Sequence, residues 1–544
     1  MLGTMMEFPL SLVHVLERVN QLFGAVEIVS RNPDRSLMRG TYADVYRRSR
    51  ALAEALQRAG LRKGDRVATL MWNHQQHLEA YFGAPISGGV LHTLNLRLHP
   101  DDVNFIVRHA KDRFLIVDDV LLPLLEKCRG GAPFEKIIVV RHGTFPAPLP
   151  PDMIDYEEFL ATATGDFKYP EIAESDACGL CYTSGTTGQC KGVVYTHRST
   201  VLHSLCISLP DSLCLRQADS LLPVVPMFHV NAWGLPYACA LTGAKLVMPG
   251  PHLDAVSLLD LIQGEKVTVG AGVPTIWLGI LEALDKEPKR WSFTDGLRMV
   301  VGGSAAPASL IRGLDKHGMR VLHAWGMTEM SPVGTVATPR AEMLALPYDE
   351  QLAIRAKQGA PVPFVEVRAV DDAGRVMPWD GKSQGELQVR GPWVAASYYQ
   401  MPAAQDRWAE DGWFKTGDVV TIDKAGFIEI TDRSKDLIKS GGEWISSVAL
   451  ENALMGHPAV KEAAVIAVPH PRWAERPLAA VVLKQGAQAT AEELAAFLGK
   501  TFLKYQVPDA FVFIDAVPRT STGKFLKSAL RERYRTFEWG TLAR

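Results

Sequence analysis

The stretch KLVMPGPHLDAVSLLDLIQGEKVTVGAGVPTIWLGILEALDKEPKRWSFTDGLRMVV, residues 245–301, decides the fold. Three short apolar runs in it have the length of strands, and two longer segments place apolar residues at helical spacing. The predicted strands are Lys245–Met248, Val267–Gly270 and Leu297–Val301, and the predicted helices are Asp254–Gln263 and Pro274–Leu284. Strands that alternate with helices of this length predict βαβ units, and therefore parallel sheets with helices on their faces.

The same alternation begins earlier in the chain. Thr41 and Asp44 have the spacing of a capping box, with Asp44 where glutamate or glutamine is usual, and Gly60 closes the helix that they start. The apolar run Arg66–Met71 then predicts a buried strand. A longer apolar region, Leu221–Met248, is interrupted by prolines, glycine and polar residues that a lone membrane span would carry at a high cost. We therefore expect buried core and pocket lining there, and no integral membrane segment.

The pattern changes beyond about Gly359. The apolar runs become shorter and are separated by glycine-rich turns, which favours antiparallel strands. These strands are Val365–Val370, Gly385–Arg390 and Gly426–Thr431. The end of the chain predicts a separate small α+β domain. Its predicted helices are Val448–Met455 and Ala491–Leu498, and its predicted strands are Val460–Val468 and Leu478–Leu483.

The composition is that of a globular protein, with 47% hydrophobic and 22% charged residues among 544. A formal net charge of -2 gives no reason to expect a nucleic-acid partner. Residues 1–7 lack the basic-then-apolar pattern of a secretory signal, so we expect a cytoplasmic protein. Seven cysteines form an irregular set, and the Cys178/Cys181 pair lies in an apolar run. We expect that pair to be buried core in a reducing compartment and not a zinc or redox site.

A loop rich in Ser, Thr and Gly, Thr183–Gly192 (TSGTTGQCKG), has the composition that wraps phosphate oxygens. Its glycines allow close backbone approach, its hydroxyls and N–H groups donate hydrogen bonds, and Lys191 adds a positive charge. The loop is not a Walker A motif, because Lys191 follows Cys190 and precedes Gly192 where that motif needs glycine and a hydroxyl residue. Composition alone would leave an ordinary loop as an alternative.

The string Thr183–Gly192 resembles the signature loop of the adenylate-forming superfamily, which contains acyl-CoA ligases, luciferases and peptide-synthetase adenylation domains. Further segments that resemble the motifs of that superfamily follow in its order. They are Gly302–Pro307 (GGSAAP), Trp325–Glu329 (WGMTE), Thr416–Asp418 (TGD), Asp432–Asp436 (DRSKD) and Pro518–Lys524 (PRTSTGK). Two positions depart from the superfamily pattern. Trp325 replaces a tyrosine, and Cys190 replaces a proline, which leaves a looser loop or, as an alternative, a reactive thiol.

The resemblance implies a fold of class α/β with two domains. We expect a large N-terminal domain, residues 1–432, of parallel or mixed sheets with flanking helices plus a distorted β-barrel. A small mobile α+β domain, residues 433–544, would follow a hinge near 433–436.

The resemblance also implies that ATP and Mg²⁺ are used to activate a carboxylic acid. Nucleotide contacts are implied for Thr183, Ser184, Gly185, Thr186, Thr187, Gly188, Lys191, Gly303, Ser304, Ala305, Ala306, Pro307, Trp325, Gly326, Met327, Asp418 and Arg433. Thr328 would contact the α-phosphate, and Glu329 would hold Mg²⁺ with Thr183. No enzyme nucleophile is required, so catalysis would be positioning and neutralisation of charge on phosphorus.

One lysine of the small domain is implied for each half of the reaction. Lys524 would bridge the carboxylate and the α-phosphate during adenylation. The small domain would then rotate about Lys435 and bring Lys439 to the site for the thiol step.

The acid is expected to be apolar, because Pro226–Gly234 contains no acidic residue to pair with a substrate ammonium group. Small residues at Gly302, Ala305, Ala306 and Gly334 leave room for a methylene chain. The implied contacts of the acid are His229, Val230, Trp233, Gly302 and Gly334, and those of CoA are Gly441, Gly442, Glu443 and Trp444.

Almost the whole chain resembles the bacterial medium- and long-chain fatty-acid–CoA ligases, in which the residue matching Trp233 gates the acyl tunnel and homodimers are common. The same subgroup includes ligases of 3-(methylthio)propionate, and the sequence separates the two poorly. A carrier-protein-loading acyl-adenylase, a luciferase-like oxidase and a non-catalytic relative are the further alternatives. Retention of Glu329, Asp418 and Lys524 argues against the last of these.

Overall fold

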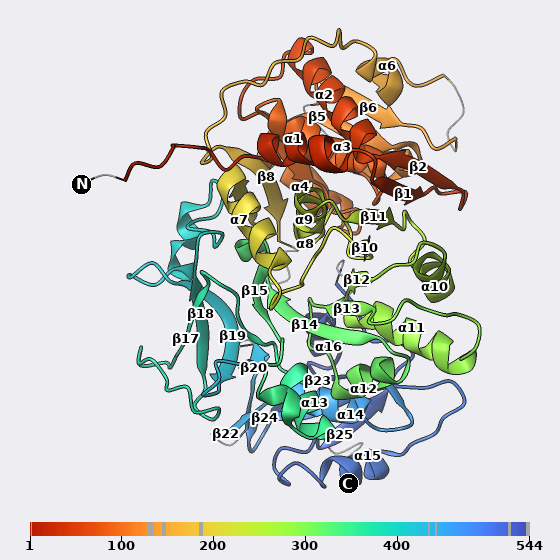
Figure 1. Cartoon of the computed structure of the whole chain (residues 1–544). Helices are drawn as coiled ribbons and strands as arrows, with labels where there is room; N and C mark the ends of the chain where they lie inside the picture. Colours follow the sequence, from red (N-terminus) through yellow and green to blue (C-terminus); the bar gives the residue numbers. More distant parts are fainter. Residues whose placement is uncertain are drawn as a thin grey trace.

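The computed structural model describes residues 1, 3–128, 134–143, 148–183, 189–433, 436–440, 443–520 and 524–539. Two large sheets and their helices form most of the molecule, and the C-terminal elements lie at the end opposite the N-terminal helices (Figure 1). No helix among the described residues is both long enough and apolar enough to pass through a bilayer.

A nine-stranded sheet crosses the middle of the molecule. In spatial order its strands are β16 (Ala360–Pro361), β15 (Val333–Val336), β14 (Arg320–Gly326), β13 (Arg298–Val301), β12 (Val269–Gly272), β10 (Ser220–Pro223), β11 (Lys245–Met248), β1 (Glu27–Arg31) and β2 (Leu37–Thr41). The strands from β14 to β1 pair in parallel, whereas β2, β15 and β16 pair antiparallel at the two ends. The predicted parallel βαβ units are therefore confirmed.

A seven-stranded sheet is built earlier in the chain. Its order is β7 (Met153–Asp155), β6 (Lys136–Val140), β5 (Asp112–Asp118), β3 (Arg66–Leu70), β4 (Val90–Thr93), β8 (Ala177–Tyr182) and β9 (Gly192–Thr196). All neighbours pair in parallel except β8 and β9. The Ser/Thr/Gly-rich loop that begins at Thr183 therefore connects the two strands of an antiparallel hairpin, β8 and β9.

Three layers of helices cover the faces of these two sheets. Neighbouring strand residues belong to different apolar clusters, as Leu221 and Leu222 do, because a strand points alternate side chains to opposite faces. Between the sheets lie α1 (Leu12–Phe23), α2 (Tyr42–Arg58), α3 (Gln75–Ile86), α6 (Tyr156–Leu160), α7 (His197–Ser208) and α9 (Leu235–Thr242). The outer face of the nine-stranded sheet packs on α10 (Ala255–Gly264), α11 (Pro274–Lys286), α12 (Ala308–Lys316) and α13 (Tyr348–Ala356). The outer face of the other sheet packs on α4 (Pro100–Ala110) and α5 (Leu122–Cys128).

A four-stranded antiparallel sheet follows where a distorted barrel was expected. Its order is β17 (Glu366–Val370), β18 (Gly385–Arg390), β19 (Phe414–Ile422) and β20 (Ile428–Arg433). In the described residues this sheet is open, and an isolated bridge from Ile428 to Gly359 ties it to the end of the nine-stranded sheet.

The small C-terminal domain is a five-stranded sheet with helices on both faces. Its strands are β22 (Glu443–Ile445), β21 (Ile438–Ser440), β24 (Ala474–Leu483), β23 (Val460–His470) and, paired with β24, β25 (Ala510–Phe513). Its helices are α14 (Ser447–Met455) and α15 (Ala491–Leu498) on one face and α16 (Lys527–Arg533) on the other. An exposed ion pair of 3.6 Å between Lys461 and Glu282 links this domain to α11.

Candidate functional site

The predicted site segments meet at the carboxyl edge of the nine-stranded sheet. From β10 the chain runs to β11 on one side and then returns to β12 on the other, so β10 and β12 flank a switch point in strand order. Ligands of open α/β sheets bind outside the carboxyl ends of strands at such points. His229 follows β10, the segment Gly302–Pro307 follows β13, and Thr328 follows β14.

Lys524 of the small domain reaches this edge. A Cβ built on Gly303 would lie 3.6 Å from Lys524 Cε, and Gly303 has a φ of +85° that favours glycine. Lys524 is also close enough to His229 to oppose its protonation. The structure therefore brings together residues more than two hundred positions apart in the sequence, from both domains.

Thr328 and Glu329 are buried in a short turn, η2 (Thr328–Met330), directly after β14. Tyr398 donates its hydroxyl to Glu329 Oε1 at 2.6 Å, and Tyr195 donates its hydroxyl to the Thr328 carbonyl at 2.6 Å. The backbone N–H of Ala395 donates to the Glu329 carbonyl at 2.7 Å. Glu329 is thus a buried carboxylate with a fixed orientation, and carboxylate oxygens are the ligands that Mg²⁺ prefers.

Asp418 connects the predicted nucleotide residues of β14, β19 and β20. The Trp325 indole donates its Nε1–H to Asp418 Oδ2 at 2.9 Å, and Arg433 Nε lies 3.4 Å from Asp418 Oδ1. Trp325 also packs against Gly334, where a Cβ would lie 2.7 Å from its ring. A carboxylate can accept about four hydrogen bonds, so Asp418 keeps capacity for a ligand hydroxyl.

The base of the phosphate-type loop is closed by two hydrogen bonds. Thr183 N–H donates to the Lys191 carbonyl at 2.9 Å, and Lys191 N–H donates to Thr183 Oγ1 at 3.1 Å. Lys191 Nζ lies 5.0 Å from the centre of the ring of Tyr398, the residue whose hydroxyl donates to Glu329. The predicted contacts Ser184, Gly185, Thr186, Thr187 and Gly188 lie outside the described residues.

Three cysteines singled out by the sequence are buried. Burial raises the pKa of the Cys190 thiol to about 11, so the reactive-thiol alternative is not supported. Burial likewise raises the pKa of Cys178 to about 12 and that of Cys181 to about 11. The Cys178/Cys181 pair therefore belongs to the core between the sheets, as predicted.

A left-handed turn holds the predicted acyl side of the site. The four residues of α8 (Val230–Trp233) all have positive φ, between 47° and 59°, and Gly234 follows at 72°. Side chains that have a Cβ pay a steric cost in this conformation. The turn places the Trp233 indole on Gly302, where a Cβ would lie 3.1 Å from the ring. The indole thus occupies the room that Gly302 was expected to leave for a methylene chain.

His229 lies at the start of this turn and is neutral at physiological pH. Burial, together with the charges of Lys524 and Arg97, lowers its pKa to about 3. A neutral imidazole can orient a polar group by hydrogen bonding but cannot form an ion pair with a carboxylate.

The remaining predicted residues of the large domain line the same edge. Ser304 is exposed, Ala305 is half-buried, and Ala306 N–H donates to His323 Nε2 at 3.3 Å. Pro307 caps α12, and Gly326 and Met327 lead from β14 into the Thr328 turn.

The predicted thiol-step residues lie on a different element, the hairpin of β21 and β22. Lys439 and Trp444 are both exposed there, with Lys439 Nζ 5.1 Å from the Trp444 ring centre. Lys435, Gly441 and Gly442 lie outside the described residues, and the Glu443 side chain is not described.

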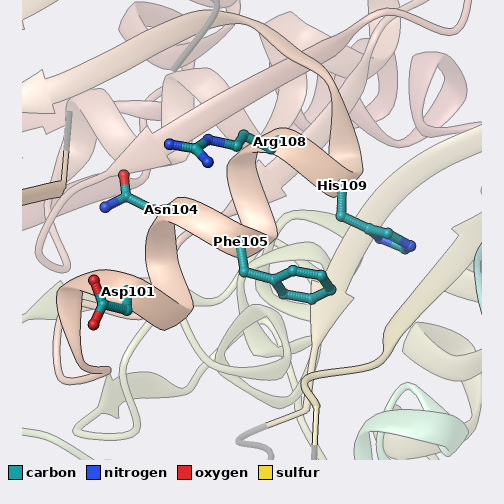
Figure 2. A pocket seen from close by; sticks show the side chains of 5 residues that line it. All are labelled: Asp101, Asn104, Phe105, Arg108 and His109. Atoms are coloured by element: carbon teal, nitrogen blue, oxygen red, sulfur yellow. The ribbon is translucent and has the colours of Figure 1, made fainter. Parts of the chain in front are cut away.

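An open pocket of about 540 Å³ lies along α4. Figure 2 shows that one helix, α4, contributes all its labelled side chains, Asp101, Asn104, Phe105, Arg108 and His109. Phe105 and His109 are stacked at 5.3 Å, and His109 Nδ1 lies 2.7 Å from the hydroxyl of Tyr182. This pocket is distinct from the carboxyl edge that holds Thr328 and Gly303.

Several site residues were missed by the sequence analysis. Tyr195 and Tyr398 support the Thr328–Glu329 turn, and Arg97 acts on His229. Asn73 holds the segment before His229, because its amide donates to Val225 O at 3.0 Å and accepts from Met227 N–H at 2.7 Å. None of these residues belongs to a motif, so no local signal could have identified them.

Comparison with known proteins agrees with this geometry. The profile of the AMP-binding enzyme family matches residues 21–399, and that of the AMP-binding enzyme C-terminal domain matches residues 449–524. A long-chain-fatty-acid–CoA ligase of Thermus thermophilus is 50% identical over 540 residues, covering 99% of this chain and 98% of that protein. A medium-chain-fatty-acid–CoA ligase of Ectopseudomonas oleovorans is 44% identical, covering 98% of each chain. A 3-methylmercaptopropionyl-CoA ligase of Ruegeria lacuscaerulensis is also 44% identical, covering 98% of this chain and 99% of that protein.

The same relation appears among solved structures. The anthranilate CoA ligase AuaEII in complex with anthranoyl-AMP superposes with a TM-score of 0.87 at 26% identity, covering 97% of this chain and 98% of that one. Sequence motifs, the convergence of both domains at one sheet edge and the family profiles agree, and we conclude that the chain belongs to the AMP-binding enzyme family.

Proposed function

We propose that this protein is an AMP-forming acyl-CoA ligase that converts a medium- to long-chain fatty acid, ATP and CoA to acyl-CoA, AMP and diphosphate through an acyl-adenylate. The observation that carries the proposal is the position of Lys524 over Gly303, beside His229 and at the carboxyl edge where Thr328 begins its turn. A flexible cation at that place can contact a carboxylate and a phosphate together.

The first half-reaction needs no protein nucleophile. The acid's carboxylate oxygen attacks the α-phosphorus of ATP, the bond from that phosphorus to the bridging oxygen breaks, and diphosphate leaves. Lys524 and Thr328 would neutralise charge on the α-phosphate, and Lys191 would face the departing diphosphate. Trp325 would stack on adenine, and Asp418 would accept the ribose hydroxyls with Arg433 beside it.

The residues present fit a magnesium ion. The buried Glu329 carboxylate, oriented by Tyr398, would hold it with the Thr183 hydroxyl. When bound, Mg²⁺ would neutralise charge on the phosphates of ATP.

In the second half-reaction the CoA thiol attacks the acyl carbon and AMP leaves. The small domain would rotate about Lys435, remove Lys524 and bring up the hairpin with Lys439 and Trp444. The glycine pair 441–442 would let the pantetheine arm pass close to the backbone.

The acid identity follows from the apolar acyl side of the site and from the relatives. Trp233 on Gly302 supports a gate that turns away when an acyl chain enters. The similarity to 3-methylmercaptopropionyl-CoA ligases makes a short sulfur-containing acid the second candidate.

Diphosphate release, measured for acids of two to eighteen carbons and for 3-(methylthio)propionate, with and without CoA, tests this proposal. Each buried methylene contributes about 0.8 kcal/mol, so kcat/KM should rise about fourfold per added carbon until the pocket is filled. Thioester formation should require CoA. A preference of tenfold or more for 3-(methylthio)propionate over every fatty acid would establish the second candidate instead.

The expectations of a homodimer and of a cytoplasmic location come from the family resemblance and the residue pattern at the N-terminus. Light scattering of the purified enzyme tests the first, with a mass near twice 59.7 kDa expected. Cell fractionation tests the second.

A further inference from the structure

A buried cluster of two histidines and an aspartate lies in the seven-stranded sheet, away from the residues assigned to acid activation. His74 Nε2 is 2.8 Å from Asp118 Oδ1, and His142 Nε2 is 3.4 Å from the same oxygen. The three potential ligand atoms all lie within 4.8 Å of one another. Among the residues that the structure describes, this is the one group of three or more such side chains with that geometry.

The cluster occupies the second switch point of the fold. From β3 the chain runs through α3 to β4 on one side, and from β5 it runs to β6 on the other side. Asp118 ends β5, His74 caps α3 after β3, and His142 follows β6. The carboxyl edge at a switch point is the favoured ligand position of an open parallel sheet. The nine-stranded sheet uses its own switch point for the adenylation site, whereas this one has no assigned use.

Hydrogen bonds from neighbouring groups hold the outer atoms of His74 and Asp118, so that His74 Nε2 and Asp118 Oδ1 face each other. Gln76 Oε1 lies 3.1 Å from His74 Nδ1 and can accept that N–H, so that a metal can replace the hydrogen bond between His74 Nε2 and Asp118 Oδ1. Trp72 N–H donates to Asp118 Oδ2 at 2.8 Å and leaves Oδ1 for the cluster. Metal-binding histidines and carboxylates are typically oriented by outer hydrogen bonds of this kind.

His142 is held in place by its backbone, since its N–H donates to Asp119 Oδ2 at 3.0 Å. A second carboxylate, that of Asp119, therefore lies beside the cluster in addition to that of Asp118.

We propose that His74, Asp118 and His142 bind one zinc-class divalent cation, with a water as fourth ligand. Two ligand atoms bound to a tetrahedral zinc ion are about 3.3 Å apart, and the nitrogen–oxygen distances of 2.8 and 3.4 Å bracket that value. Two imidazoles favour Zn²⁺ over Mg²⁺ and Ca²⁺, which prefer all-oxygen ligand sets.

The ion ties together the loops that follow β3, β5 and β6. His74 is the chain neighbour of Asn73, whose side chain holds the segment leading to His229. Zinc at this place stabilises the large domain and the support of the acyl side without contacting the reacting atoms.

The test uses the purified full-length enzyme, stripped with chelator, dialysed and then exposed to Zn²⁺, Mg²⁺ or Ca²⁺. Bound metal is counted by elemental analysis, and the thermal midpoint is recorded with and without metal. We expect one zinc per chain and a midpoint higher by about 3 °C or more at saturating zinc. Mg²⁺ and Ca²⁺ should not reproduce the midpoint rise that depends on His74 and His142. The zinc Kd of the His142→Gln and His74→Gln variants should be about tenfold weaker or more.

The exposed His99 provides a matched control, because His99→Gln removes one imidazole that lies outside the cluster. That variant should bind zinc as the wild type does. In chelator, His142→Gln should unfold within a few degrees of the equally stripped wild type. That result would show that the variant folds and has lost only the ion. The proposal is overturned if the stripped wild-type enzyme takes up no zinc. It is also overturned if the wild type and all three variants take up zinc equally. In either case the cluster would be a hydrogen-bonded triad without a metal.

Discussion

Tyr398 joins two predicted functions in one side chain. Its hydroxyl donates to Glu329 and its ring lies under Lys191, so the proposed magnesium ligand and the loop lysine share a support. Desolvation and the neighbouring Glu329 hold the pKa of this phenol well above its usual range. The hydroxyl is therefore protonated at physiological pH and donates to the carboxylate.

Replacing Tyr398 by phenylalanine should slow adenylation about 10- to 100-fold, because hydrogen bonds to charged groups contribute about 1.5–3 kcal/mol. The apparent Mg²⁺ requirement should rise at the same time. Diphosphate release at varied Mg²⁺ measures both effects. Tyr399→Phe is the control, since its hydroxyl accepts from the Gln400 amide, whereas that of Tyr398 donates to Glu329. Equal rates in the two variants would contradict the role given to Tyr398.

The sequence allowed Glu329, Asp418, Trp325 and Lys524 to be predicted because each lies in a motif. Tyr398 and Tyr195 could not be predicted, since they act through contacts with residues 69 and 133 positions away. The bond from Trp325 to Asp418 was missed for the same reason, although both residues were assigned to the nucleotide.

At the scale of elements, the sequence predicts hydrogen-bonded helix caps better than it predicts where a strand begins and ends. Thr41 and Asp44 form the expected capping box at the start of α2, because that motif is completed within four residues. The predicted strand Val267–Gly270 is instead Val269–Gly272. Val267 still belongs to the turn after α10, where its N–H donates to Ile262 O, and pairing with β13 sets the register. The pairing partners lie too far along the chain for local pattern to fix the strand ends.

The turn α8 could not be predicted from propensity, because four consecutive residues with a Cβ rarely adopt left-handed conformation. The packing around it supplies the compensation. Asn231 Oδ1 accepts from Cys181 Sγ at 3.3 Å, and Ala232 is fully buried. Strain of this kind persists where surrounding structure determines it and is concentrated at functional sites.

Gly234→Ala should destabilise the large domain by about 1–3 kcal/mol, because a side chain there is strained and its Cβ would lie 2.8 Å from His203 Nδ1 at a φ of +72°. Thermal and urea unfolding measure the change. Gly279→Ala in α11 is the matched control, since its Cβ would meet nothing within 4 Å. That exchange should stabilise the helix by about 0.5–1 kcal/mol. A Gly234→Ala enzyme as stable as the wild type would contradict the strain argument.

At the scale of the whole molecule, the structure has the arrangement that the proposed adenylation step requires. Lys524 lies on Gly303, and the small domain touches α11 through Lys461 and Glu282. Lys439 and Trp444, which we propose for the thiol step, are exposed on their hairpin. A single small domain that presents Lys524 in one orientation would have to rotate before the hairpin could replace it.

Lys524→Ala should therefore lower acyl-adenylate formation about 100-fold or more, since it removes a positive charge from the reacting phosphate. Thioester formation from supplied acyl-AMP and CoA should stay within a few fold of the wild type, because that step uses the other face of the small domain. Lys461→Ala is the matched control. Its pair with Glu282 is exposed, at 48% and 67%, and such pairs contribute about 0–1 kcal/mol. Adenylation by this variant should fall less than about fivefold. If Lys524→Ala lost both half-reactions together, one static arrangement would serve both steps and the proposed rotation would be wrong.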